Sequence, residues 1–131
     1  MTSHSTAASQ RLNPGDLIDR SVLARVLDDV GLENADMLLD VFIEELAGQA
    51  QALEAAAGAD LEAMGRAAHQ IKGSAATLGA NRLGHLAESI EAAARARDAA
   101  AGLAMADFHG LVQASRQALG QIRQEGVGAT N

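Results

Sequence analysis

The sequence has no Cys, no Trp and no Tyr, and its one Pro is Pro14. Without Cys, neither a disulfide nor a thiolate metal site can form. Aromatic residues make up only 2% of the 131 residues, so strand formers and platforms for stacking nucleic-acid bases are scarce. No Pro interrupts a helix after position 14, and Ala, the best helix former, supplies much of the 48% hydrophobic content. The composition therefore predicts an all-α domain.

Positive charge is also scarce, because 10 Lys and Arg stand against 17 Asp and Glu and give a formal net charge of −7. This balance disfavours a nucleic-acid partner, whose phosphates need a cationic face. No apolar run approaches the ~18–20 residues that span a bilayer. The N-terminal stretch MTSHSTAASQRLNPG lacks the apolar region of a secretory signal. We therefore expect a cytoplasmic protein that binds neither nucleic acid nor a membrane.

Apolar residues recur at helical spacing between clear start and stop residues. Residues 1–12 and 126–131 are predicted to be flexible tails around a single domain of residues 13–125. A first, short helix is expected to start at Asn13-Pro14 and to end at Gly31. Four longer helices are expected from Asn34 to Gly58, from Asp60 to Gly79, from Asn81 to a break near Arg97-Asp98, and from there to about residue 125. Long helices joined by short turns favour an antiparallel four-helix bundle, with the first helix packed over one end.

The third predicted helix carries polar residues on the face opposite its apolar seam. At ~100° per residue, His69 lies roughly 140° from the centre of that seam and so faces water. Arg66 and Lys72 lie within about 60° of it on the helical wheel. An isolated exposed His is most simply a surface residue without a role, but two flanking cations give this one a possible chemistry.

Small residues surround the same histidine. Gly73 lies in the middle of a periodic helix, where Gly costs ~1 kcal/mol relative to Ala. It points away from the seam, so close packing of a neighbouring helix is a weak explanation for it. Gly65 and Ala76 border the same patch. Together these residues are expected to clear space for the approach of a partner.

Such a surface suits a histidine that carries a phosphoryl group. Neutral imidazole offers a nitrogen nucleophile near pH 7, and a phosphoryl group adds roughly −1.5 to −2 charges. Lys72, one turn after His69, can screen that charge with a charge-assisted hydrogen bond. The sequence has no phosphate-binding Gly-rich loop and no kinase motif. The predicted role is to receive and pass on a phosphoryl group without an ATP site.

Residues 69–80, HQIKGSAATLGA, are similar to the signature H-x-[apolar]-K-G-[small]-[small]-x-x-[apolar]-G of histidine-containing phosphotransfer (Hpt) domains. The resemblance extends over roughly residues 16–122. It implies a four-helix bundle, usually monomeric, with His69 as the phosphoacceptor. It also implies that Lys72 neutralises the phosphate and that Gly73 leaves room for the partner.

In many members of this family, a Gln or Glu on the next helix hydrogen-bonds and orients the imidazole. Here that position is Glu91, which would hold the proton on the facing ring nitrogen and leave the other as nucleophile. Arg95, four residues later on the same face, would meet a phosphate or a carboxylate of the partner. The alternative for Glu91 and Arg95 is an ordinary i,i+4 surface salt bridge.

Two other histidines have simpler explanations. His85 and Glu88 have the spacing of metal ligands on one helix turn, but a site in a bundle core needs matching ligands from other helices, and we expect no metal. His109 follows Phe108 at the edge of an apolar stripe and is expected to be a partly buried structural residue.

The leading hypothesis is a phosphorelay intermediate in two-component signalling. It accepts a phosphoryl group on His69 and passes it to or from an aspartate of a response-regulator receiver domain, with a (hybrid) histidine kinase as a further partner. It is expected to be a carrier rather than an enzyme and to need no cofactor, since Mg²⁺ would be held by carboxylates of the receiver.

Three alternatives remain open at this point. They are a phosphotransfer domain of a chemotaxis-type kinase, a bundle adaptor that is not phosphorylated, and the dimerisation domain of a sensor kinase. The last class usually shows H-E-x-x-x-P, whereas Gln70 follows His69 here and no Pro follows position 14.

Overall fold

The computed structural model describes residues 17–98 and 100–126, and every regular element within them is a helix. The elements in chain order are α3 (Arg20–Val30), a 3-10 helix η1 (Leu32–Asn34), α4 (Ala35–Ala56), α5 (Leu61–Leu78), α6 (Asn81–Arg95) and α7 (Ala100–Glu125). The predicted tails, residues 1–12 and all of 126–131 except Gly126, lie outside the described residues. In the described part of the chain, no helix combines the length and the apolar character needed to cross a membrane.

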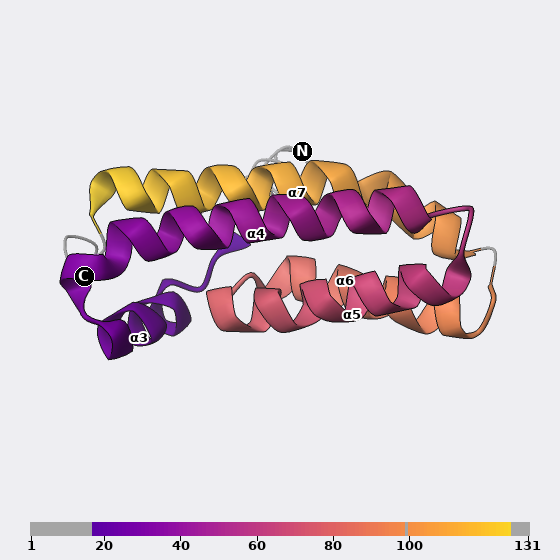
Figure 1. Ribbon diagram of the computed structural model, residues 1–131, viewed down its shortest axis with the longest axis horizontal. Helices are drawn as coiled ribbons and strands as arrows, with labels where there is room; N and C mark the ends of the chain where they lie inside the picture. Colours follow the sequence, from indigo (N-terminus) through magenta and orange to yellow (C-terminus); the bar gives the residue numbers. More distant parts are fainter. Residues whose placement is uncertain (1–16, 99, 127–131) are drawn as a thin grey trace, which may run out of the picture.

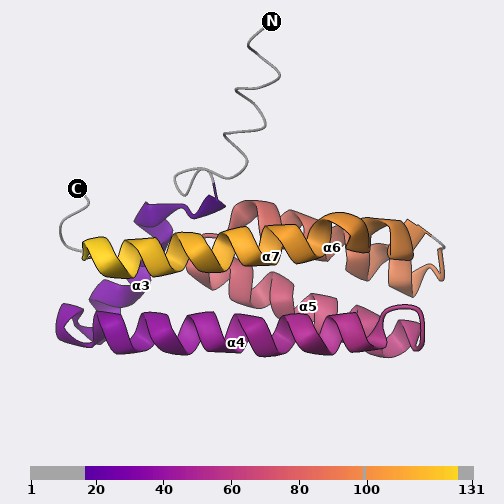
Figure 2. The same cartoon turned by 90° about the horizontal axis from the view of Figure 1, so that it is seen from above.

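Helices α4 to α7 form the predicted antiparallel four-helix bundle. Each helix packs on the next one in the sequence, and α7 packs on α4 to close the ring. Figure 1 shows α4 and α7 along one side of the molecule and α5 and α6 along the other. The shorter pair leaves one end of the bundle open, and α3 lies there, as Figure 2 also shows. It contacts α5 and α4, so the expected end cap is confirmed.

The ends of α5 agree with the sequence prediction. The Asp60 side chain accepts hydrogen bonds from the backbone N–H groups of Glu62 and Ala63, each at 3.1 Å, as an N-cap residue does. At the other end, Gly79 adopts a left-handed conformation with φ of 76°. A Cβ at this position would lie 2.6 Å from the backbone oxygen of Asp19, so both the conformation and the close approach of α3 require glycine.

The first predicted helix is interrupted just before α3. Asp19 is in an extended conformation, and its side chain caps α3 by accepting a hydrogen bond from the backbone N–H of Ser21 at 3.1 Å. The predicted start at Asn13-Pro14 lies outside the described residues. Leu17 is helical, and the chain leaves helical geometry at Ile18, which is 1% exposed, before α3 begins at Arg20. The single helix expected up to Gly31 is therefore interrupted at Ile18 and Asp19.

The hydrophobic core fills the space between the four long helices. The centre of the buried face of α5 is formed by Met64, Ala68, Ile71, Ala75 and Leu78, each no more than 2% exposed. These residues repeat at steps of three and four, as predicted from the sequence. Their packing fixes the rotation of α5 and so decides which residues of this helix face solvent.

Candidate functional site

His69 lies near the middle of α5, on the side turned away from the core. Its side chain is 59% exposed, which confirms the predicted orientation. The neighbouring residues on the helix, Ala68 and Ile71, are fully buried. The imidazole is therefore held on a well-packed helix while its ring remains open to an approaching molecule.

The imidazole is oriented by Glu91 of the adjacent helix α6. His69 Nδ1 lies 2.9 Å from Glu91 Oε2. Because an ionised carboxylate can only accept a hydrogen bond, the neutral imidazole carries its hydrogen on Nδ1. The lone pair is then on Nε2, the ring nitrogen that Glu91 does not contact.

Glu91 is a buried carboxylate shared by three side chains. Its side chain is only 7% exposed, and it pairs with Lys72 Nζ at 3.2 Å and with Arg95 Nη2 at 2.7 Å in addition to His69. The Arg95 contact is the i,i+4 pair considered above, but its carboxylate lies inside the protein rather than on the surface. The sequence alone did not reveal this sharing, because it joins α5 and α6.

The pKa of Glu91 reflects opposing effects. Burial raises the pKa, but the hydrogen bonds from Lys72 and His69 and the positive charge of Arg95 outweigh burial and hold the pKa below its ordinary value of 4.5. Glu91 is therefore ionised at neutral pH. It keeps the cations of Lys72 and Arg95 next to the imidazole.

The surface one turn beyond His69 is open. A Cβ added at Gly73 would meet no atom within 4 Å, so no neighbouring helix requires a glycine there. Gly73 and Ala76 are both exposed. The two residues leave a low surface beside the imidazole.

Gly65 and Arg66 lie differently from each other. Gly65 is buried, and a Cβ there would lie 3.8 Å from Ala94 Cβ and from Arg95 Cγ. The expectation that Gly65 opens the surface beside His69 is therefore wrong, because this residue packs against α6. Arg66 is exposed, and its side chain makes no hydrogen bond or ion pair with any other described residue.

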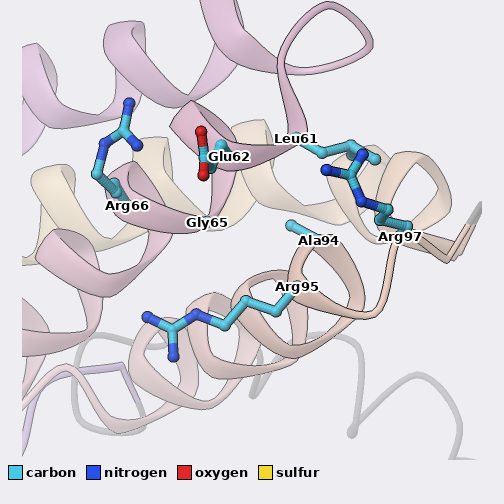
Figure 3. Close-up of a pocket in the computed structure, with 7 residues that line it drawn as sticks. All are labelled: Leu61, Glu62, Gly65, Arg66, Ala94, Arg95 and Arg97. Carbon is cyan, nitrogen blue, oxygen red and sulfur yellow. The ribbon is translucent and has the colours of Figure 1, made fainter.

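Gly65 and Arg66 belong to the lining of a pocket of about 410 Å³ between the start of α5 and the end of α6, shown in Figure 3. Its lining consists of Leu61, Glu62, Gly65, Arg66, Ala94, Arg95 and Arg97. Sequence reasoning missed Arg97. One signal was available in the sequence. The predicted helix break at Arg97-Asp98 contains no Gly, although the chain has 13 Gly residues.

His85 and His109 do not belong to this site. His109 is 69% exposed at its side chain, and its Nδ1 lies 2.9 Å from Glu54 Oε2. The expectation of a partly buried structural residue is therefore wrong, since the ring turns outward to Glu54 while Phe108 fills the core. His85 is exposed. Within the described residues, no three potential His, Cys, Asp or Glu ligands cluster as a metal site would require.

Comparison with known proteins identifies the family of the chain. The model of the Hpt domain family matches residues 37–125, and the chain belongs to this family. It is similar to two curated relatives, the phosphorelay proteins LuxU of Vibrio vulnificus strains YJ016 and CMCP6. Each is 32% identical over 85 residues, which cover 64% of this chain and 74% of the relative. No solved structure matches the chain significantly.

Proposed function

We propose that the protein is a phosphorelay intermediate that carries a phosphoryl group on Nε2 of His69. The group passes to or from an aspartate of a receiver domain, and a histidine kinase or hybrid kinase supplies the relay. One observation carries this proposal: the imidazole is exposed while buried Glu91 holds its Nδ1 at 2.9 Å. Membership of the Hpt family and similarity to phosphorelay proteins support it.

The residues around His69 have complementary parts in the proposed transfer. The Nε2 lone pair attacks the phosphorus of the aspartyl phosphate, the P–O bond to the aspartate breaks, and the carboxylate leaves with that electron pair. No proton has to move. Glu91 stabilises the positive charge that develops on the ring, and Lys72 faces the added negative charge of the phosphoryl group. The reverse steps return the group to an aspartate.

The site geometry also suits a partner of protein size. In-line transfer needs the reacting atoms at about 3–3.5 Å, so a receiver domain must come into contact with α5. The open surface at Gly73 and Ala76 leaves room for that contact. The proposal takes the protein to be a cytoplasmic monomer that acts as a carrier rather than a kinase. Mg²⁺ would be bound by the receiver.

Transfer of labelled phosphoryl groups tests this proposal. The protein is incubated with each radiolabelled receiver of the source organism, in parallel with His69→Gln and the control variant His85→Gln. We expect wild type and His85→Gln to become labelled and His69→Gln to remain unlabelled, because His85 is also exposed but lacks the Glu91 contact. The label should be lost in acid and retained in base, as an N–P bond requires.

Equal labelling of wild type and His69→Gln would show that His69 is not the acceptor. Receiver binding without any labelling of the wild type would instead favour an adaptor that is not phosphorylated.

A further inference from the structure

A second functional surface adjoins the phosphotransfer site. Arg66 of α5 and Arg95 and Arg97 at the end of α6 line the pocket of about 410 Å³ (Figure 3). The whole chain has only 10 Lys and Arg against 17 Asp and Glu. Three of these few cations line one pocket. The pocket is therefore locally positive, although the protein as a whole carries a net negative charge.

Two of the three arginine side chains of this arginine pocket are unpaired in the part of the chain that the structure describes. The side chains of Arg66 and Arg97 make no hydrogen bond or ion pair with other described residues, whereas Arg95 pairs with Glu91 at 2.7 Å. Glu62 is the one acidic residue of the lining. In Figure 3 Arg66 extends from α5, Arg95 runs along α6 and Arg97 points toward Leu61, so the three guanidinium groups are spread around the pocket and do not meet at one point. Such a spread suits several carboxylates of a protein surface.

The backbone at Arg97 is a separate observation that points to the same pocket. Arg97 has a φ of 55°, whereas the other positive-φ residues in the described part of the chain are Gly31, Gly58, Gly79 and Gly126. Left-handed backbone is unfavourable for a residue with a side chain. An arginine in the position where this sequence otherwise places glycine indicates that its side chain is needed.

We propose that the arginine pocket binds acidic side chains of the receiver domain that docks on His69. This inference rests on the proposed function and concerns the recognition of the partner, not the transfer of the phosphoryl group. The pocket belongs to the surface that a docked receiver covers, because Arg66 lies one turn before His69 on α5 and Arg95 contacts the carboxylate that orients His69.

The chemistry of the lining favours carboxylates. Guanidinium groups form paired hydrogen bonds with carboxylates, and the pocket has only Leu61, Gly65 and Ala94 as apolar lining. Ligand pockets for small organic molecules are mostly apolar and aromatic, which this pocket is not. Inorganic phosphate shares the chemistry of a carboxylate, so the test includes it.

The test compares charge reversals inside and outside the pocket. Single-turnover transfer from the phosphorylated protein is measured against receiver concentration for wild type, Arg66→Glu, Arg97→Glu and the control Arg82→Glu. Arg82 is exposed on the same helix as Arg95. It lies about two and a half turns before Glu91 and therefore faces about 180° away from it. All three variants change the net charge equally.

We expect the two pocket variants to raise the half-saturating receiver concentration by roughly fivefold or more at low salt, since charge steers and aligns partners. The rate at saturation should stay within about twofold of wild type, and the difference should shrink at about 0.5 M salt because screening shortens the reach of the charges. Arg66→Lys, which keeps the charge, should restore most of the affinity, and Arg82→Glu should change it by less than about twofold.

Half-saturation that is equal for pocket and control variants would overturn this inference, while transfer by the wild type would leave the proposed function intact. If the wild type transfers to no receiver, the proposed function fails and this inference fails with it. A third result concerns free anions. If receiver affinity is unchanged but inorganic phosphate shifts the arginine side-chain NMR signals of wild type and not of Arg66→Glu, the pocket binds a small anion and our assignment is wrong.

Discussion

At the scale of single residues, Glu91 determines the arrangement of the site. A buried carboxylate without partners would be costly, but this one accepts from His69, Lys72 and Arg95. The family resemblance implied the contact with His69, and the i,i+4 spacing suggested the pair with Arg95, but the contact with Lys72 was not predicted. The sequence did not show that one carboxylate makes all of them, because that depends on the distance between α5 and α6.

The lowered pKa of Glu91 leads to a prediction about acid stability. A carboxyl whose pKa is lowered on folding stabilises the protein at a pH above its ordinary value of 4.5, and this contribution is lost as the pH falls towards the lower folded pKa. We expect the free energy of unfolding of wild type to rise more between pH 3 and pH 6 than that of Glu91→Gln. Urea denaturation over this range measures both, and parallel curves would contradict the shared-carboxylate arrangement.

At the scale of helices, the ends of α5 and the start of α3 show what the sequence predicts well. Asp60 and Gly79 were assigned correctly because a cap acts on the few residues beside it. The sequence did not predict the break at Ile18 and Asp19 that precedes α3. Such a break depends on which apolar residues the bundle buries, and this is not local information.

The open face of α5 gives a paired prediction. Gly73 and Gly110, on α5 and α7, are both exposed helical glycines with no atom within 4 Å of an added Cβ. Gly73→Leu and Gly110→Leu should each raise the free energy of unfolding by roughly 0.5–1 kcal/mol, because glycine is a poor helix former. Only Gly73→Leu should slow phosphotransfer, by about tenfold or more, since it obstructs in-line approach. Stability is read by urea denaturation and transfer by single-turnover labelling.

Unchanged transfer by Gly73→Leu would refute the role of clearance at this position. A matching loss of transfer in Gly110→Leu would instead point to an effect on the whole bundle.

The end of α6 should also be more stable without its arginine. Arg97 adopts a left-handed backbone, and Arg97→Gly should relieve it and raise the free energy of unfolding by about 1 kcal/mol. Thermal unfolding measures this gain. A lower melting temperature than wild type would mean that the Arg97 side chain contributes to packing, which weakens the case that it is kept for a partner.

At the scale of the whole molecule, the ring of α4 to α7 was predictable and the surfaces built across it were not. Periodicity gives the buried face of each helix, and short connections give the antiparallel order. The sequence did not predict that Gly65 packs on α6, that His109 turns outward to Glu54, or that Arg97 joins Arg66 and Arg95. Each of these contacts depends on the relative axial position of two neighbouring helices, which periodicity does not determine.

The shared carboxylate has a consequence for reversibility under the proposed function. Lys72 and Arg95 already neutralise Glu91, so an arriving phosphoryl group must compete for their charge instead of finding it unused. If both cations were unpaired, they would stabilise the phosphohistidine strongly and slow the release of the phosphoryl group. Because Glu91 competes for them, the free energy of the phosphohistidine stays nearer to that of the aspartyl phosphates of the donor and the acceptor. Transfer can then proceed in both directions.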